Sequence, residues 1–148
     1  MLRVVLDTNQ LISAILNPHG LADTILKAAG LGSDQKYELV ISKSITKEIG
    51  RVLRYPRIKK LHNWSEEKID LFLALLEEIA FVSGETDETS TIIIKADPDD
   101  DKFLLAALNA GASYIVSRDE HLLSLGEYKG ITILSPEVFL SALKRGAL

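Results

Sequence analysis

The sequence predicts an α/β fold, specifically a three-layer α/β/α sandwich around a mainly parallel sheet of four or five strands. Short apolar runs suited to buried strands alternate along the chain with longer segments of helical periodicity. The segments between successive runs are long enough for right-handed crossovers, which return the chain parallel to the strand before. In such a sheet the carboxyl ends of the strands share one edge, where binding sites form. We therefore expect functional side chains at that edge.

Length and composition fit a globular protein. Of the 148 residues, 47% are hydrophobic and 26% are charged, so we expect residues 1–148 to form a single domain with a substantial core. No apolar run approaches the roughly 18 to 20 residues that span a membrane. Met1 is not followed by a basic leader and a long apolar stretch. We therefore expect a cytoplasmic protein with no membrane attachment.

Cysteine content and net charge exclude several kinds of site. The chain has no cysteine, which excludes disulfides, thiolate zinc sites and cysteine nucleophiles. Any metal is therefore expected to be held by oxygen or histidine, and the three histidines have no spacing typical of metal ligands. The formal net charge of −4 provides no overall attraction to nucleic acid, so nucleic-acid contact requires a local basic surface.

The predicted strands follow the apolar runs. The first run is apolar at nearly every position, as expected of a central strand covered on both faces. The others are shorter and bounded by turn residues. The predicted strands are residues 2–6, 38–41, 92–94, 113–116 and 131–134.

The predicted helices follow cap and stop signals. Ser42 or Ser44 can cap one helix, Ser65 opens a long amphipathic helix, Pro56 and Gly111 follow helix ends, and Pro136 begins the last helix. The predicted helices are residues 10–16, 21–29, about 44–53, a segment from 66 to about 79, 103–110, 120–125 and 136–144.

Acidic residues occur where the predicted strands end. Asp7 follows the first strand, and Asp119 follows the strand at 113–116. Asp101 closes an aspartate run that opens a helix apolar on most sides. Because parallel strands end at one edge, these carboxylates are expected to converge there. Asp100 is adjacent to Asp101, and the sequence does not decide which of the two faces the site.

A fourth acid comes from the helix that follows residue 42. At about 100° per residue, its apolar and basic side chains fall on opposite arcs, with Glu48 on the border between them. The apolar arc contains Ile45, Ile49, Val52 and Leu53, and the basic arc contains Lys43, Lys47, Arg51 and Arg54. Glu48 can therefore face the core edge while the basic side chains face solvent or a polyanion.

Four segments together resemble the PIN domain family, in particular the VapC-like toxin ribonucleases of prokaryotic type II toxin–antitoxin systems. Their order and spacing are more specific than any single piece, and they cover nearly the whole chain. The segments are VVLDTNQLISA from residue 4, SITKEIGRVL from 44, DDDKFLLAALNAGASYIVSRDEHLL from 99 and GITILSPEVFL from 130.

The resemblance implies a role for each matched residue. The four acids of the family correspond to Asp7, Glu48, Asp101 and Asp119, and the residues that would support them are Thr8, Asn9, Ser117 and Asp100. Position 117 is Ser where the family often has Thr, which keeps the hydroxyl. The resemblance further implies cleavage of single-stranded RNA, a cognate antitoxin and a homodimer.

The chemistry expected of these acids follows from their charge. Crowded carboxylates cannot all ionise unless a cation neutralises them, and oxygen ligands favour Mg²⁺ or Mn²⁺. Such a cation supplies water activation and stabilises charge on a phosphodiester. We expect Asp7, Asp101 and Asp119 to bind the metal. Glu48 is expected to bind it through water or to orient the nucleophile.

Each feature also has an interpretation without catalysis. Asp7 and Asp119 can be helix caps, the aspartate run can be favourable helix-dipole charge, and Glu48 can pair with Arg51 or Arg54. The basic arc can be a solvated helix face.

Other functional classes fit the sequence less well. A receiver domain needs paired acids after the first strand, and a phosphohydrolase with an aspartyl nucleophile needs a second aspartate at position 9, where Asn9 stands. The remaining alternatives are a PIN domain that acts in RNA processing and a non-catalytic PIN-like binding or scaffolding module.

Overall fold

The computed structural model describes residues 1–32, 34–84 and 101–148. The predicted strand at 92–94 and the candidate Asp100 lie outside these residues. Within them, no helix combines the length and apolar character needed to cross a membrane.

The sheet confirms the predicted α/β fold class. Among the described residues it has six strands, where four or five were predicted, in the order β3-β2-β1-β4-β6-β5. All neighbouring pairs are parallel except β5 with β6. The strands are β1 (Arg3–Leu6), β2 (Glu38–Ile41), β3 (Phe81–Val82), β4 (Tyr114–Val116), β5 (Glu127–Tyr128) and β6 (Ile131–Leu134). The four longer strands are predicted ones, and they form the middle of the sheet. The two outer strands have two residues each, too short for a periodic pattern.

The helices agree closely with their sequence signals. They are α1 (Thr8–Leu16), α2 (Leu21–Lys27), α3 (Lys43–Leu53), α4 (Pro56–His62), α5 (Glu66–Ile79), α6 (Asp101–Ala110), α7 (Glu120–Leu125) and α8 (Pro136–Lys144). Ser42 caps α3 by accepting a hydrogen bond from the backbone N–H of Ile45 (3.3 Å), and Ser65 caps α5. Helix α4 is not among the predicted elements. It begins at Pro56. Proline lacks a backbone N–H, and the first residue of a helix has no helical partner for that group, so proline is well suited to this position.

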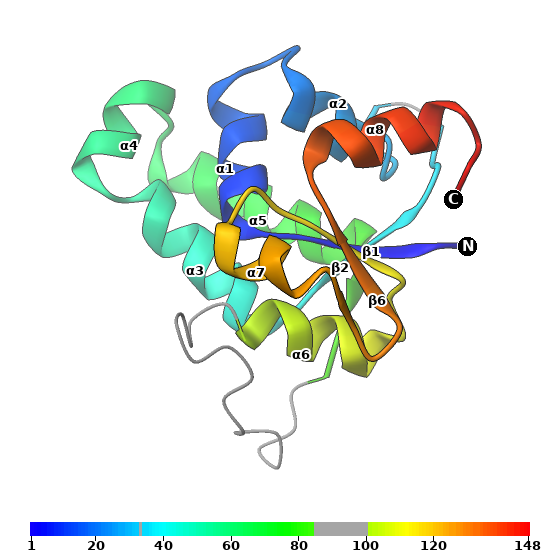
Figure 1. Cartoon of the computed structure of the whole chain (residues 1–148). Coiled ribbons are helices and arrows are strands. Elements are labelled where there is room, and N and C mark those ends of the chain that lie inside the picture. The colour runs from blue at the N-terminus through cyan, green and yellow to red at the C-terminus, as the bar shows by residue number, and fades with distance from the viewer. Residues whose placement is uncertain (33, 85–100) are drawn as a thin grey trace.

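Helices cover both faces of the sheet. Figure 1 shows α2 and α8 on one side of the strands and α6 on the other. Strand β1 lies between β2 and β4, and its residues Val4, Val5 and Leu6 are buried, as predicted for a central strand. Helix α6 packs against β1, β2 and β4 with Phe103 and Leu104 buried. Because α6 begins where these strands end, its first residues lie at the predicted active-site edge.

A buried tyrosine joins three elements on the face of the sheet covered by α2 and α8. Tyr37 precedes β2, and its hydroxyl donates a hydrogen bond to the carbonyl oxygen of Ile25 in α2 (2.7 Å). Its ring meets that of Phe139 in α8 edge to face, with centroids 5.4 Å apart. Burial raises the pKa of Tyr37, so the hydroxyl stays protonated and available as a donor.

The substitution Tyr37→Phe is expected to lower the free energy of unfolding by about 1–2 kcal/mol, because it leaves the buried Ile25 carbonyl without its donor. Urea denaturation followed by circular dichroism measures the change. Tyr114→Phe is the matched control, since Tyr114 is half-buried and shows no hydroxyl hydrogen bond among the described residues. An equal loss in both variants would contradict the role given to the Tyr37 hydroxyl.

Candidate active site

Asp7 lies between the end of β1 and the start of α1. Its carboxylate caps α1, with Oδ1 accepting a hydrogen bond from the backbone N–H of Gln10 (2.9 Å). Its other oxygen, Oδ2, accepts a hydrogen bond from the Ser117 hydroxyl. The residue is only 4% exposed. Asp7 is therefore a helix cap, as the interpretation without catalysis expects. It is also a buried acid at the carboxyl edge of the sheet.

Ser117 connects Asp7 to Asp119. It follows β4, is 0% exposed, and its Oγ accepts a hydrogen bond from the backbone N–H of Asp119 (2.9 Å) while donating to Asp7. Asp119 caps α7 by accepting hydrogen bonds from the backbone N–H groups of His121 (2.8 Å) and Leu122 (3.2 Å). The structure thus brings together the two acids that follow β1 and β4, because those strands are parallel neighbours.

Glu48 reaches the same edge from α3. Its Oε1 accepts a hydrogen bond from the hydroxyl of Thr8, the residue after Asp7. Its Oε2 forms an ion pair with Lys102 Nζ (2.7 Å) and a longer one with Arg51 Nη2 (3.7 Å). Its side chain is 17% exposed. Glu48 therefore links α1, α3 and α6 at the point where α1 and α6 begin.

The acids influence one another electrostatically. Burial is the main cause that raises the pKa of Asp7 above its ordinary value. Hydrogen bonds from Ser117 and the Gln10 backbone act in the opposite direction, and the negative charges of Asp119 and Glu48 raise the pKa further. Three of the four predicted acids are therefore close enough to share one electrostatic environment.

The remaining predicted residues occupy different positions. Asp101 is the first residue of α6 and is buried, next to Lys102. Thr8 is buried against Glu48, whereas Asn9 is exposed. Asp100 lies outside the described residues. Because Lys102 pairs with Glu48, the start of α6 is held beside α3.

The basic arc of α3 is partly neutralised by α5. Lys43 pairs with Glu77 (2.6 Å), and Arg54 pairs with Glu66 (2.6 Å) and Asp70 (2.9 Å). The apolar arc faces the core, with Ile45, Ile49 and Leu53 buried, as predicted. Lys47 and Arg51 are exposed and remain the better candidates for contact with a polyanion.

Lys102 is a site residue that sequence reasoning missed. Its position directly after Asp101 could have indicated that it lies near the acids. The sequence does not show, however, how α6 is rotated relative to α3. Only the packed structure places its ammonium on Glu48.

The donor set suits a hard divalent cation, because it consists of carboxylate and hydroxyl oxygens and includes a buried carboxylate that faces two other negative charges. Among residues 1–32, 34–84 and 101–148, however, no three acidic or histidine side chains are close enough to enclose a metal ion.

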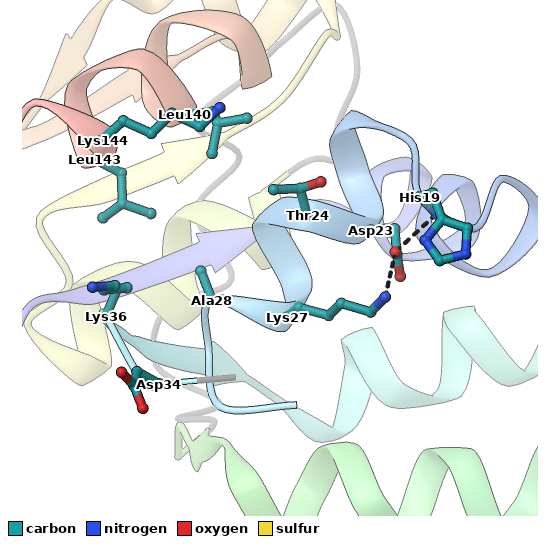
Figure 2. Close-up of a pocket in the computed structure, with 10 residues that line it drawn as sticks. All are labelled: His19, Asp23, Thr24, Lys27, Ala28, Asp34, Lys36, Leu140, Leu143 and Lys144. Carbon is teal, nitrogen blue, oxygen red and sulfur yellow. Dashed lines mark hydrogen bonds and ion pairs between the residues drawn. The ribbon is translucent and has the colours of Figure 1, made fainter. Parts of the chain in front are cut away.

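A separate pocket of about 690 Å³ lies between α2 and α8 (Figure 2). It is lined by His19, Asp23, Thr24, Lys27, Ala28, Asp34, Lys36, Leu140, Leu143 and Lys144. Within it, Asp23 pairs with Lys27 (2.9 Å) and accepts a hydrogen bond from the His19 backbone N–H (2.9 Å). Lys36 precedes β2, so this pocket lies towards the amino ends of the strands and contains none of the predicted site residues.

One relative by sequence and one solved structure are similar to this chain. The protein MJ1680 of Methanocaldococcus jannaschii, described as uncharacterized, is 34% identical over 124 residues, which are 84% of this chain and 75% of that protein. The fold is similar to that of PAE2754 from Pyrobaculum aerophilum, with a TM-score of 0.61, 16% identity, and coverage of 97% of this chain and 90% of that one.

A second solved structure has a similar fold. It is VapBC2 from Rickettsia felis bound to a DNA fragment from their promoter, with a TM-score of 0.59, 15% identity, and coverage of 90% of this chain and 98% of that one. The family model for the PIN domain matches residues 3–121, a range that contains all four predicted acids. The chain therefore belongs to the PIN domain family.

Proposed function

We propose that this protein is a metal-dependent endoribonuclease that cleaves single-stranded RNA. PIN domains are generally nucleases that use divalent metal ions. The observation that carries the proposal is the pair of hydrogen-bond chains at the carboxyl edge of the sheet. Ser117 joins Asp7 to Asp119, and Thr8, the residue after Asp7, donates a hydrogen bond to Glu48.

The proposed roles follow from these contacts. Asp7, Asp101 and Asp119 hold Mg²⁺ or Mn²⁺, and Glu48 contributes through water or orients the nucleophile. When bound, the cation supplies the positive charge that activates water and stabilises the phosphodiester as it is cleaved. Ser117 and Thr8 fix the orientation of the carboxylates by donating hydrogen bonds to them.

The RNA surface that we propose is on α3. Lys47 and Arg51 are exposed, and they lie one residue before and three residues after Glu48 on that helix. Arg51 also lies within ion-pair distance of Glu48 (3.7 Å), so phosphates bound there would be close to the acids.

We further propose that the nuclease acts in the cytoplasm as a homodimeric toxin paired with an antitoxin. The sequence resemblance to VapC-like toxins motivates this role. The similarity of fold to VapBC2, which was solved bound to a DNA fragment from their promoter, supports it.

Cleavage of a fluorescent single-stranded RNA tests the nuclease proposal. We expect cutting with Mn²⁺ or Mg²⁺, no cutting with EDTA, and 5′-phosphate ends on the products. Asp119→Asn is expected to lose cutting, whereas Glu120→Gln is expected to retain it. These adjacent acids form a matched pair, because Glu120 is exposed at the start of α7, whereas the charge of Asp119 acts on Asp7.

Cutting that survives both EDTA and Asp119→Asn would show another mechanism or a contaminant. Folded wild-type protein that binds RNA without cutting any RNA tested would favour a binding module.

A further inference from the structure

Lys102 places a positive charge inside the group of acids. Its Nζ is 2.7 Å from Glu48 Oε2, while the Thr8 hydroxyl donates to Glu48 Oε1, so both oxygens of this carboxylate are occupied. The side chains of Lys102 and Glu48 are only 19% and 17% exposed. Arg51 approaches the same oxygen from solvent at 3.7 Å and is 65% exposed.

These two basic residues should therefore differ greatly in their effect on Glu48. A short ion pair that is shielded from water is stronger than a long ion pair exposed to solvent, because water and salt weaken the exposed pair. Removal of the partner of a shielded charge leaves that charge uncompensated. Lys102 is thus the main counter-charge of Glu48 among the residues described.

We propose that Lys102 is a built-in counter-ion that neutralises Glu48 in the metal-free protein and must release that carboxylate before a divalent cation can use it. The inference rests on the proposed function in one respect, namely that the acids bind a cation.

The chemistry of lysine suits this exchange. Its ammonium is a compact charge on a flexible four-carbon stem, so it can leave the carboxylate by rotation without moving α6. Because the ammonium and the cation compete for one carboxylate, the ion pair lowers the affinity for metal. Lys102 therefore sets the metal concentration at which the site fills, and we class it as a positioning residue.

Isothermal titration calorimetry of the RNA-free protein with Mn²⁺ measures the metal affinity and tests the proposal. We expect Lys102→Met to bind Mn²⁺ about tenfold more tightly than the wild type, because the competing charge is gone. Lys102→Gln is also expected to bind Mn²⁺ more tightly than the wild type. It replaces Lys102→Met in the test if the methionine variant does not fold. Arg51→Met is the matched control, because it removes one positive charge near the same oxygen and is expected to change the affinity less than about threefold.

Thermal unfolding separates this role from a purely structural one. In EDTA, Lys102→Met should melt at a lower temperature than the wild type, since Glu48 loses its nearest positive charge. Saturating Mn²⁺ should reduce that difference, because the cation takes over the neutralising charge. A structural role alone would leave the Mn²⁺ affinity unchanged and the melting difference intact.

The outcomes are distinguishable. Equal Mn²⁺ affinity in the wild type and both Lys102 variants would overturn this inference alone. An equal effect of Arg51→Met would show general electrostatics in place of a specific counter-ion and would also overturn it. Absence of Mn²⁺ binding by all four proteins would overturn both this inference and the metal dependence of the proposed function.

Discussion

The Asp7→Asn variant is expected to cleave RNA at least about 10³-fold more slowly than the wild type, while its fold is at least as stable at neutral pH. The amide cannot supply the negative charge that the proposed cation requires. Its oxygen can still cap α1, because asparagine is as good a cap as aspartate. Activity and stability should therefore change in opposite directions.

The expected stability gain has a definite pH dependence. Burial and the charges of Asp119 and Glu48 raise the pKa of Asp7 above its ordinary value of 3.8. A carboxyl whose pKa is raised by folding contributes stability that is fully present below pH 3.8 and is lost as the pH rises through the folded-state pKa. The advantage of Asp7→Asn over the wild type should therefore grow as the pH increases above 3.8.

Asp23→Asn is a suitable control because its pH dependence has the opposite sign. Burial acts to raise the pKa of Asp23, but hydrogen bonds from Lys27 and the His19 backbone, with the charge of Lys27, hold it below its ordinary value. The stability that Asp23 contributes is present above pH 3.8 and lost as the pH falls. Asp23→Asn should thus lose stability at neutral pH and retain cleavage.

Urea denaturation from pH 3 to pH 8, together with initial cleavage rates, measures both effects. Full cleavage by Asp7→Asn would exclude its carboxylate from the reaction. A stability loss that grows with pH would contradict the electrostatic environment described for Asp7.

The second large effect is expected at Ser117. Ser117→Ala should lower the cleavage rate by about 10- to 100-fold, the usual cost of removing a group that orients a metal ligand. The alanine leaves Asp7 Oδ2 without its hydroxyl donor and the Asp119 N–H without its acceptor. Both acids would then lose a contact that holds them in place.

Ser117→Thr separates the hydroxyl from the packing. Threonine keeps the hydroxyl but adds a methyl group at a fully buried position, which is expected to cost about 1–3 kcal/mol of stability. We expect Ser117→Thr to cleave faster than Ser117→Ala although it is less stable than the wild type. The two rates, measured at saturating metal and at a temperature where both variants are folded, test this order. Faster cleavage by the alanine variant would show that the hydroxyl does not orient the acids.

Local signals determined most of the fold. The apolar runs predicted the four central strands, and the caps at Ser42 and Ser65 and the proline at Pro136 predicted where helices begin. These signals are readable because each acts within a few residues of the backbone groups it satisfies. The strands β3 and β5 were not predictable in this way, and Pro56, which begins the short helix α4, was interpreted only as the end of the helix before it. Strand β3 pairs with β2, which is distant in sequence. Strand β5 pairs with its sequence neighbour β6 over only two residues, too few for a periodic pattern.

The candidate site was also predictable only in part from the sequence. The sequence by itself determined that Asp7 and Asp119 lie at one edge, because they follow strands of a parallel sheet. Only the tertiary structure decided that the Ser117 hydroxyl, which accepts locally from the Asp119 N–H, also donates to Asp7, and that Lys102 forms an ion pair with Glu48. The physical reason is that strand direction follows from topology. The bond from Ser117 to Asp7 depends on β4 lying next to β1 in the sheet, and the ion pair from Lys102 to Glu48 depends on how α6 and α3 pack against each other.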